Sequence, residues 1–119
     1  YALYEEKRFD LPLEEVNLSK VGTLEFEKPD YLKYPALKLG FDVLEYGGLA
    51  GAAFNAAKEE ALDNFLDYNL SFLGMADVVR ATMDDLTSKN LLSSEVELEA
   101  VMEIDLQARV TAKAFVDKF

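Results

Sequence analysis

Apolar and polar residues follow two different patterns along the chain, and the change falls near Pro35. Before it, residues 21–27 alternate apolar and charged side chains with a period of two, which predicts a β-strand with one buried face. Pro29 ends this strand. A lone strand leaves its backbone groups unpaired, so it needs a partner strand, and residues 1–9, which are expected to be extended, supply part of one.

From Pro35 onward, apolar residues recur at helical spacing and predict four helices. The expected ranges are about 35–46, 49–68, 74–86 and a last helix that ends near 118, after a Ser-x-x-Glu capping box at 94–97. The stripes expected to face the core are Leu37, Phe41 and Leu44; Ala50, Phe54, Ala57, Ala61, Phe65 and Tyr68; Met75, Val79, Met83 and Leu86; and Leu98, Val101, Ala108, Ala112 and Phe115.

Short connections between amphipathic helices favour an antiparallel bundle, because each apolar stripe needs a facing stripe. The predicted fold class is therefore mainly α. A four-helix bundle over residues 35–119 follows a linker arm over residues 1–34, which contains one or two short β-strands.

The amino-acid composition excludes several kinds of catalytic site and metal site within this chain. Its 119 residues carry 12 Lys and Arg against 23 Asp and Glu, a formal net charge of −11, and include no His, Cys or Trp. Thiol nucleophiles, Ser-His-Asp triads and zinc sites built on His or Cys are therefore excluded within this chain. The negative charge argues against nucleic acid and anionic membranes as partners. The chain reads as a soluble protein, and the lack of Cys fits the cytoplasm.

Acidic residues are the first candidates for chemistry. Glu59, Asp63 and Asp67 lie four apart on the second helix, and Asp84 and Asp85 close the third. A divalent cation could bind such an array, but a ferritin-like site needs Glu-x-x-His pairs. A solvated acidic face is the favoured interpretation.

Glycines at 47, 48 and 51 resemble a phosphate-binding loop only superficially. They follow a helix rather than a strand, they lack the Gly-x-Gly-x-x-Gly spacing, and no Lys-Ser/Thr pair follows them. A turn between two helices explains them better.

Two polar pairs lie on apolar faces of predicted helices. Asp105 falls on the stripe of the last helix and Arg109 follows four residues later, so the two side chains can pair. Asn55 and Glu59 share a face of the second helix in the same way. We expect these residues to fix how the helices meet, not to act as catalytic groups.

The order of several segments resembles 1-deoxy-D-xylulose 5-phosphate reductoisomerases over essentially the whole chain. The matching segments are YAL at 1–3, KR at 7–8, VNLSKVGTLEFEKPD at 16–30, YPALKL at 34–39, FNAAKE at 54–59, FLGM at 72–75 and DLQAR at 105–109. Departures from the family pattern occur at Glu5, Glu6, Ala36, Lys58 and Glu60, and those on the second helix put its usual polar network in doubt.

The resemblance implies that this chain is the linker and C-terminal helical bundle of such an enzyme, inactive alone. The parent converts 1-deoxy-D-xylulose 5-phosphate to 2-C-methyl-D-erythritol 4-phosphate in isoprenoid precursor synthesis, with NADPH and Mg²⁺ or Mn²⁺. The partners implied are the NADPH-binding and catalytic domains of the same polypeptide, in a homodimer. The family's catalytic, cofactor and metal residues lie upstream of Tyr1, so none is assigned here.

A different class of protein also fits the residues when the resemblance is set aside. The chain could be a free-standing acidic helical interaction module that has only the bundle in common with the enzyme. Cut from its parent enzyme, the chain is instead expected to self-associate through its N-terminal arm, with exchange of arms between protomers as one route.

Overall fold

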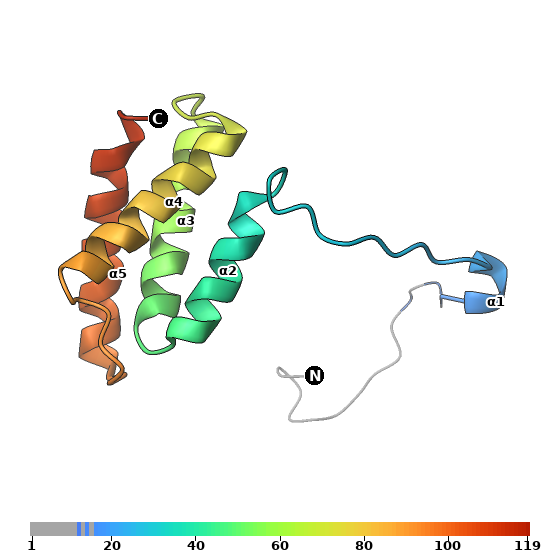
Figure 1. Ribbon diagram of the computed structural model, residues 1–119, viewed down its shortest axis with the longest axis horizontal. Helices are drawn as coiled ribbons and strands as arrows, with labels where there is room; N and C mark the ends of the chain where they lie inside the picture. Colours follow the sequence, from blue (N-terminus) through green and yellow to red (C-terminus); the bar gives the residue numbers. More distant parts are fainter. Residues whose placement is uncertain (1–11, 13, 15) are drawn as a thin grey trace.

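The computed structural model describes Pro12, Glu14 and residues 16–119. These residues form helices and irregular segments, which confirms the mainly α class. The helices are α1 (Leu18–Val21), α2 (Pro35–Tyr46), α3 (Ala50–Leu66), α4 (Phe72–Ser88) and α5 (Leu98–Val116). Successive helices from α2 to α5 run in opposite directions (Figure 1).

The predicted strand over residues 21–27 is wrong for the chain as described. Val21 ends α1, and residues 22–30 have no regular secondary structure. Asn17 caps this short helix, since its side chain accepts a hydrogen bond of 3.0 Å from the Ser19 amide. Alternating side chains favour a strand only where another strand accepts the backbone hydrogen bonds, and Pro12, Glu14 and residues 16–119 contain none. The expected partner, residues 1–9, lies outside the described residues.

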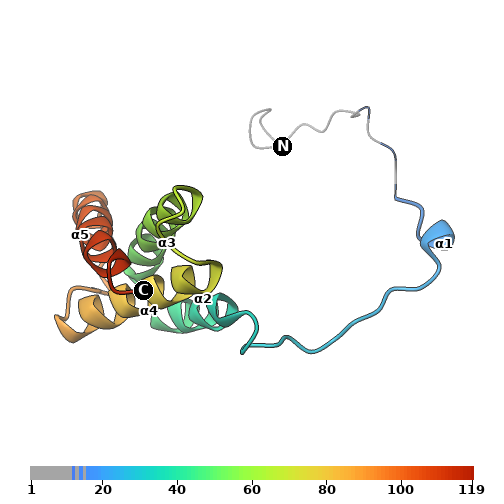
Figure 2. The same ribbon diagram turned by 90° about the horizontal axis from the view of Figure 1, so that it is seen from above.

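Small side chains form the contact between α3 and α5, the most extensive helix pairing. Alanine lets two helix backbones approach closely at little entropic cost. α4 packs against both helices, as Figure 2 shows from above. The fully buried alanines of the two helices are Ala50, Ala53, Ala56 and Ala57 on α3 and Ala108 and Ala112 on α5.

Larger side chains fill the space between α4 and this pair. Leu86 and Ile104 pack with the alanines near the start of α3, and Val78, Val79 and Val116 pack near its end. The predicted α4 stripe is confirmed, because Val79 and Leu86 are buried and the methionines of that stripe contact the same clusters.

The face of α2 that packs on the other helices differs from the predicted one. α2 lies against α3 and α4 through Leu39 and Val43, which join the core clusters. Leu37, Phe41 and Leu44 are instead 42%, 52% and 77% exposed. The helix is apolar on two sides, so periodicity alone did not determine which side faces the core.

Two further predicted core residues lie at helix ends and are exposed. Tyr68 follows the end of α3 with a positive φ of 61°, and 96% of it is exposed. Leu98 is the first residue of α5 and is 69% exposed. Helical periodicity holds only inside a helix, so residues at the ends no longer follow the stripe.

The predicted capping box before α5 does not form. Glu97 is the residue before the helix and makes no capping hydrogen bond, while the Ser93 hydroxyl accepts a bond of 3.0 Å from the Glu95 amide. Ser71 is the capping serine of the bundle, because its hydroxyl accepts a bond of 3.0 Å from the Gly74 amide at the start of α4. α4 consequently begins two residues before the predicted start.

The predicted turn between α2 and α3 is confirmed. Gly47 and Gly48 have φ values of 70° and 53°, in the left-handed region that favours glycine. A Cβ at Gly48 would also collide with the backbone of Ser93. The Leu49 amide donates a hydrogen bond of 2.9 Å to the Ser93 carbonyl, so this turn is tied to the loop that leads into α5.

Candidate functional site

A network of four polar side chains joins α3 to α5. Arg109 donates from Nε to Asp105 Oδ2 at 2.8 Å and from Nη2 to Asp105 Oδ1 at 3.2 Å. The same Nη2 donates to Glu59 Oε2 at 2.6 Å. Asn55 donates from its amide to Glu59 Oε1 at 2.9 Å. The two pairs expected from their spacing are therefore present, and Arg109 connects them.

The network is partly open to solvent. The side chains of Arg109, Asp105 and Glu59 are 35%, 38% and 47% exposed. Hydrogen bonds from Arg109 and then from Asn55 lower the pKa of Glu59 below its ordinary value of 4.5. Hydrogen bonds to Asp105 and Glu59 raise the pKa of Arg109. Each shift stabilises the charged form, which suits a permanent ion pair and not a group that exchanges protons in a reaction.

The other candidate carboxylates do not converge on a common point. Asp63 and Asp67 lie further along the exposed side of α3, and Asp84 is exposed on α4. Asp85 pairs with Lys89, at 2.6 Å, within the end of α4. Among residues that the structure describes, no group of three or more carboxylates is placed to hold a metal ion.

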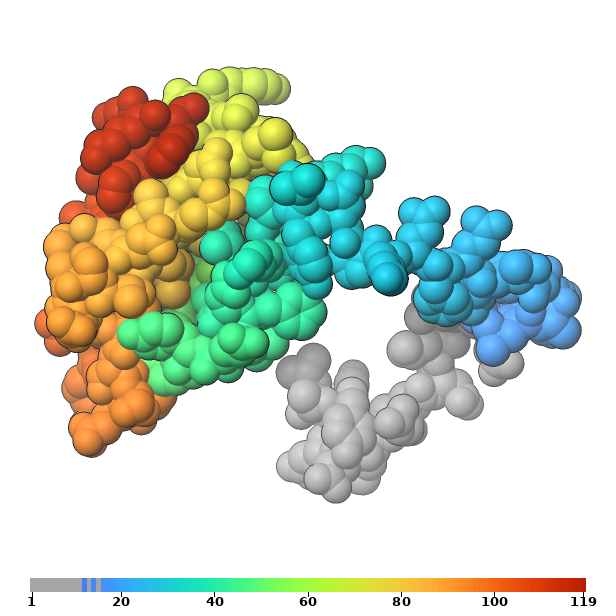
Figure 3. Space-filling view, viewed as in Figure 1, coloured from blue at the N-terminus to red at the C-terminus, as the bar shows by residue number. Residues whose placement is uncertain are grey.

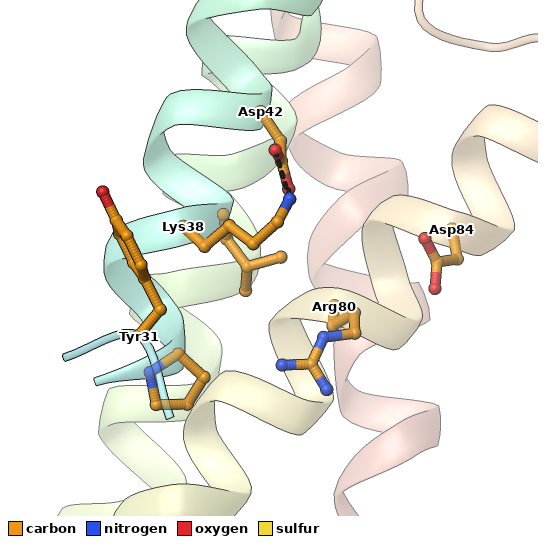
Figure 4. Close-up of a pocket in the computed structure, with 7 residues that line it drawn as sticks. Tyr31, Lys38, Asp42, Arg80 and Asp84 are labelled. Atoms are coloured by element: carbon orange, nitrogen blue, oxygen red, sulfur yellow. Dashed lines mark hydrogen bonds and ion pairs between the residues drawn. The ribbon is translucent and has the colours of Figure 1, made fainter. Parts of the chain in front are cut away.

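A groove of about 360 Å³ lies between the start of α2 and the middle of α4 (Figure 4). Lys38 and Arg80 contribute positive charge to it, and Asp42 and Asp84 contribute negative charge. Lys38 already pairs with Asp42 at 2.7 Å, and Arg80 pairs with Asp77 at 3.2 Å. The groove therefore presents balanced and largely paired charge, with no arrangement of a nucleophile beside a base.

The glycine turn at residues 47–48 follows α2, and the backbone of Ser93 fills the space beside Gly48, so the turn leaves no cradle for a phosphate.

None of the helices in the described part of the chain is long and apolar enough to cross a membrane.

The alanine-packed helices and the ion-pair network between α3 and α5 define a helical domain. Residues 1–111 match the family model of the DXP reductoisomerase C-terminal domain. The chain belongs to this family.

Curated relatives carry the same resemblance along nearly the whole chain. The 1-deoxy-D-xylulose 5-phosphate reductoisomerase of Jannaschia sp. (strain CCS1) is 44% identical over 115 residues, which are 96% of this chain and 29% of the relative. That of Sinorhizobium fredii is 40% identical over 98% of this chain and 29% of the relative. The chain thus spans less than a third of the length of these relatives.

A solved structure supports the same relation. The 1-deoxy-D-xylulose 5-phosphate reductoisomerase from Zymomonas mobilis, in complex with NADPH, superposes with a TM-score of 0.81 at 35% sequence identity. The match covers all of this chain and 30% of that one.

Sequence reasoning missed the contact that completes the polar network. Glu59 and Arg109 are 50 residues apart, so no local spacing signals their pairing. The pairs Lys38–Asp42 and Asp85–Lys89 were also missed, although their four-residue spacing on a helix is a usable signal. Lys58 is exposed outside the network, and the Asn64 amide donates to Glu60.

Proposed function

We propose that this chain is the C-terminal part of a 1-deoxy-D-xylulose 5-phosphate reductoisomerase and supports that enzyme's catalytic domain. The observation that carries the proposal is the pattern of coverage. Relatives at 40–44% identity align with 96–98% of this chain, but the chain accounts for only 29% of each. In this proposal residues 1–34 are a linker and residues 35–119 a helical bundle.

The proposed parent enzyme rearranges and reduces 1-deoxy-D-xylulose 5-phosphate to 2-C-methyl-D-erythritol 4-phosphate in isoprenoid precursor synthesis. Its NADPH and its Mg²⁺ or Mn²⁺ are held by residues upstream of this chain, in a homodimeric, cytoplasmic protein. This assignment rests on the resemblance and agrees with the polar groups described above, which are engaged in helix packing.

Within the enzyme, the bundle acts by rigidity and carries no catalytic, cofactor-binding or metal-binding residue. The alanine contact and the Arg109 network hold α3 and α5 together without any group left poised for proton transfer. A firmly packed domain of this kind positions a neighbouring catalytic domain, since catalytic groups need support from rigid elements.

Sequencing the complete reading frame tests the assignment directly. We expect an upstream region that includes a nucleotide-binding fingerprint, a strand followed by Gly-x-Gly-x-x-Gly and a helix. A reading frame that starts near Tyr1 would overturn the proposal and favour a free-standing acidic module.

Enzyme assays test the proposed division of labour. The product of the complete reading frame is expected to oxidise NADPH when 1-deoxy-D-xylulose 5-phosphate and Mg²⁺ are added, and the 119-residue chain is expected to show neither turnover nor NADPH binding by calorimetry. Turnover or NADPH binding by the 119-residue chain would contradict the inactive role.

A further inference from the structure

α2 is apolar on two sides, and within the described part of the chain only one of them is covered. Its charged side chains Lys38, Asp42 and Glu45 occupy a single stripe. Leu39 and Val43 pack against the core clusters. A second apolar stripe, spaced four and three residues apart, is at least 42% exposed at every position. We call this stripe the outer face of α2; it consists of Leu37, Phe41 and Leu44.

Apolar residues on two sides are typical of a helix that is covered on both sides by other parts of a protein. Surface helices of a free domain carry polar residues on the side away from the core, and a helix that is apolar nearly all round is buried. Contiguous exposed apolar side chains mark interaction surfaces. The regular spacing of the outer face is the pattern that places side chains on one line along a helix.

Exposed apolar side chains also occur on the chain before α2. Leu24, Phe26 and Leu32 are 59%, 88% and 95% exposed. The segment that carries them leaves the helical part at the start of α2 (Figure 3). Exposed apolar side chains are therefore found both on α2 and on the segment that leads from it toward the N-terminal side.

We propose that the outer face of α2 docks on an apolar surface of the upstream part of the same polypeptide. The inference rests on the proposed function, in which most of the enzyme precedes this chain, as the 29–30% coverage of relatives suggests. A partner joined through a linker is present at a high effective concentration, which favours docking through the small face that Leu37, Phe41 and Leu44 form. A second copy of this chain has no such advantage.

Thiol labelling tests the proposal because the 119 residues contain no cysteine. Leu44→Cys places a thiol on the outer face, and Glu45→Cys places one on the neighbouring charged stripe as a matched control. Each variant is made both in the 119-residue chain and in the product of the complete reading frame. Mass spectrometry of the α2 peptide measures labelling separately from any upstream cysteine.

We expect the ratio of labelling rates, Cys at 44 over Cys at 45, to fall at least tenfold in the longer protein. An unchanged ratio overturns the proposal. A ratio that falls in the 119-residue chain alone as its concentration rises also overturns it, and assigns the face to a second copy. A separate experiment tests the proposed function. A reading frame without upstream residues would contradict it, and this is determined by sequencing before any labelling is done.

Discussion

At the scale of single residues, Arg109 is the side chain that connects the two most closely packed helices. Its guanidinium contacts Asp105 on its own helix and Glu59 on α3. Exposed ion pairs add little to the free energy of unfolding, because water and salt screen them. The bidentate pair with Asp105 orients the guanidinium on α5, and its Nη2 donates to Glu59, which links α5 to α3.

The lowered pKa of Glu59 predicts a pH-dependent effect of Glu59→Gln. The charged form is favoured by folding, so its stabilisation is present above the ordinary pKa of 4.5 and is lost as the pH falls through the lower folded value. We expect the variant to have a lower Tm than the parent chain at pH 7, and the difference to shrink below pH 4.5. Thermal unfolding, followed by circular dichroism at pH 7 and at a pH below 4.5, measures the difference in Tm.

Asp63→Asn is the matched control, since Asp63 lies one turn further along the exposed side of α3. We expect it to leave Tm nearly unchanged at neutral pH. A difference between Glu59→Gln and the parent that stays constant from neutral to acid pH would contradict the assigned ion pair.

Gly48 is a residue where both conformation and space demand glycine. Its φ is 53° and a Cβ would collide with Ser93. We expect Gly48→Ala to destabilise the chain by about 1–3 kcal/mol. Gly51→Ala is the control, because Gly51 is helical and has open space around it; alanine there is expected to stabilise by up to about 1 kcal/mol. Urea unfolding of both variants measures the change in the free energy of unfolding. Equal changes in the two variants would contradict the close approach between Gly48 and Ser93.

At the scale of helices, packing and capping decide where each element lies. α3 and α5 meet through alanines, so the contact has little room for larger groups. α4 begins at Ser71, whose hydroxyl satisfies the Gly74 amide. α5 has no such cap, and its start is set by the loop that Leu49 holds through Ser93.

A larger side chain in the alanine contact is expected to push α3 and α5 apart. Ala57 is fully buried, so Ala57→Leu forces a shift that costs about 1–3 kcal/mol. Ala114→Leu on the exposed side of α5 adds the same atoms where there is room, and we expect it to change stability by less than about 0.5 kcal/mol. Chemical denaturation compares the two. Similar losses in both would mean that the contact is not tightly packed.

The two serines that precede helices predict different outcomes on substitution. Ser71→Ala removes the cap of α4 and is expected to cost about 1 kcal/mol. Ser94→Ala removes a hydroxyl that caps no helix, and we expect Tm to stay the same. Differential scanning calorimetry of the two variants measures the contrast. A larger loss for Ser94→Ala would restore the capping box.

At the scale of the whole molecule, charge and exposed apolar surface dominate. A net charge of −11 on 119 residues produces self-repulsion that opposes compaction. The apolar surface that α2 leaves uncovered is the opposite kind of feature, one that favours association.

The self-repulsion predicts that salt stabilises the chain. Raising ionic strength shortens the screening length from about 30 Å at 0.01 M to about 8 Å at 0.15 M. We expect Tm to rise over this range. A double variant, Asp63→Lys and Asp67→Lys, lowers the net negative charge and is expected to show a smaller rise. A fall of Tm with added salt would indicate that favourable ion pairs outweigh the repulsion.

Much of the helical structure was predictable from the sequence, because its signals are local. Pro35 and the two glycines at 47 and 48 correctly bounded α2, and the spacing of Asp105 and Arg109 correctly predicted their ion pair. The strand predicted over residues 21–27 does not form in the part of the chain that the structure describes, because a strand depends on a partner outside itself. The link from Arg109 to Glu59 was not predictable, since it joins residues 50 positions apart.

The amino-acid sequence by itself determined that the chain is helical, where most of its helices lie, and to which family it belongs. Only the tertiary structure decided which side of α2 is covered, which serine caps a helix, and how the polar pairs of α3 and α5 join. The physical reason is that helix periodicity and short-range pairing follow from local backbone geometry. The choice between two apolar faces depends instead on which surfaces other helices offer, and that is settled only when the whole chain packs.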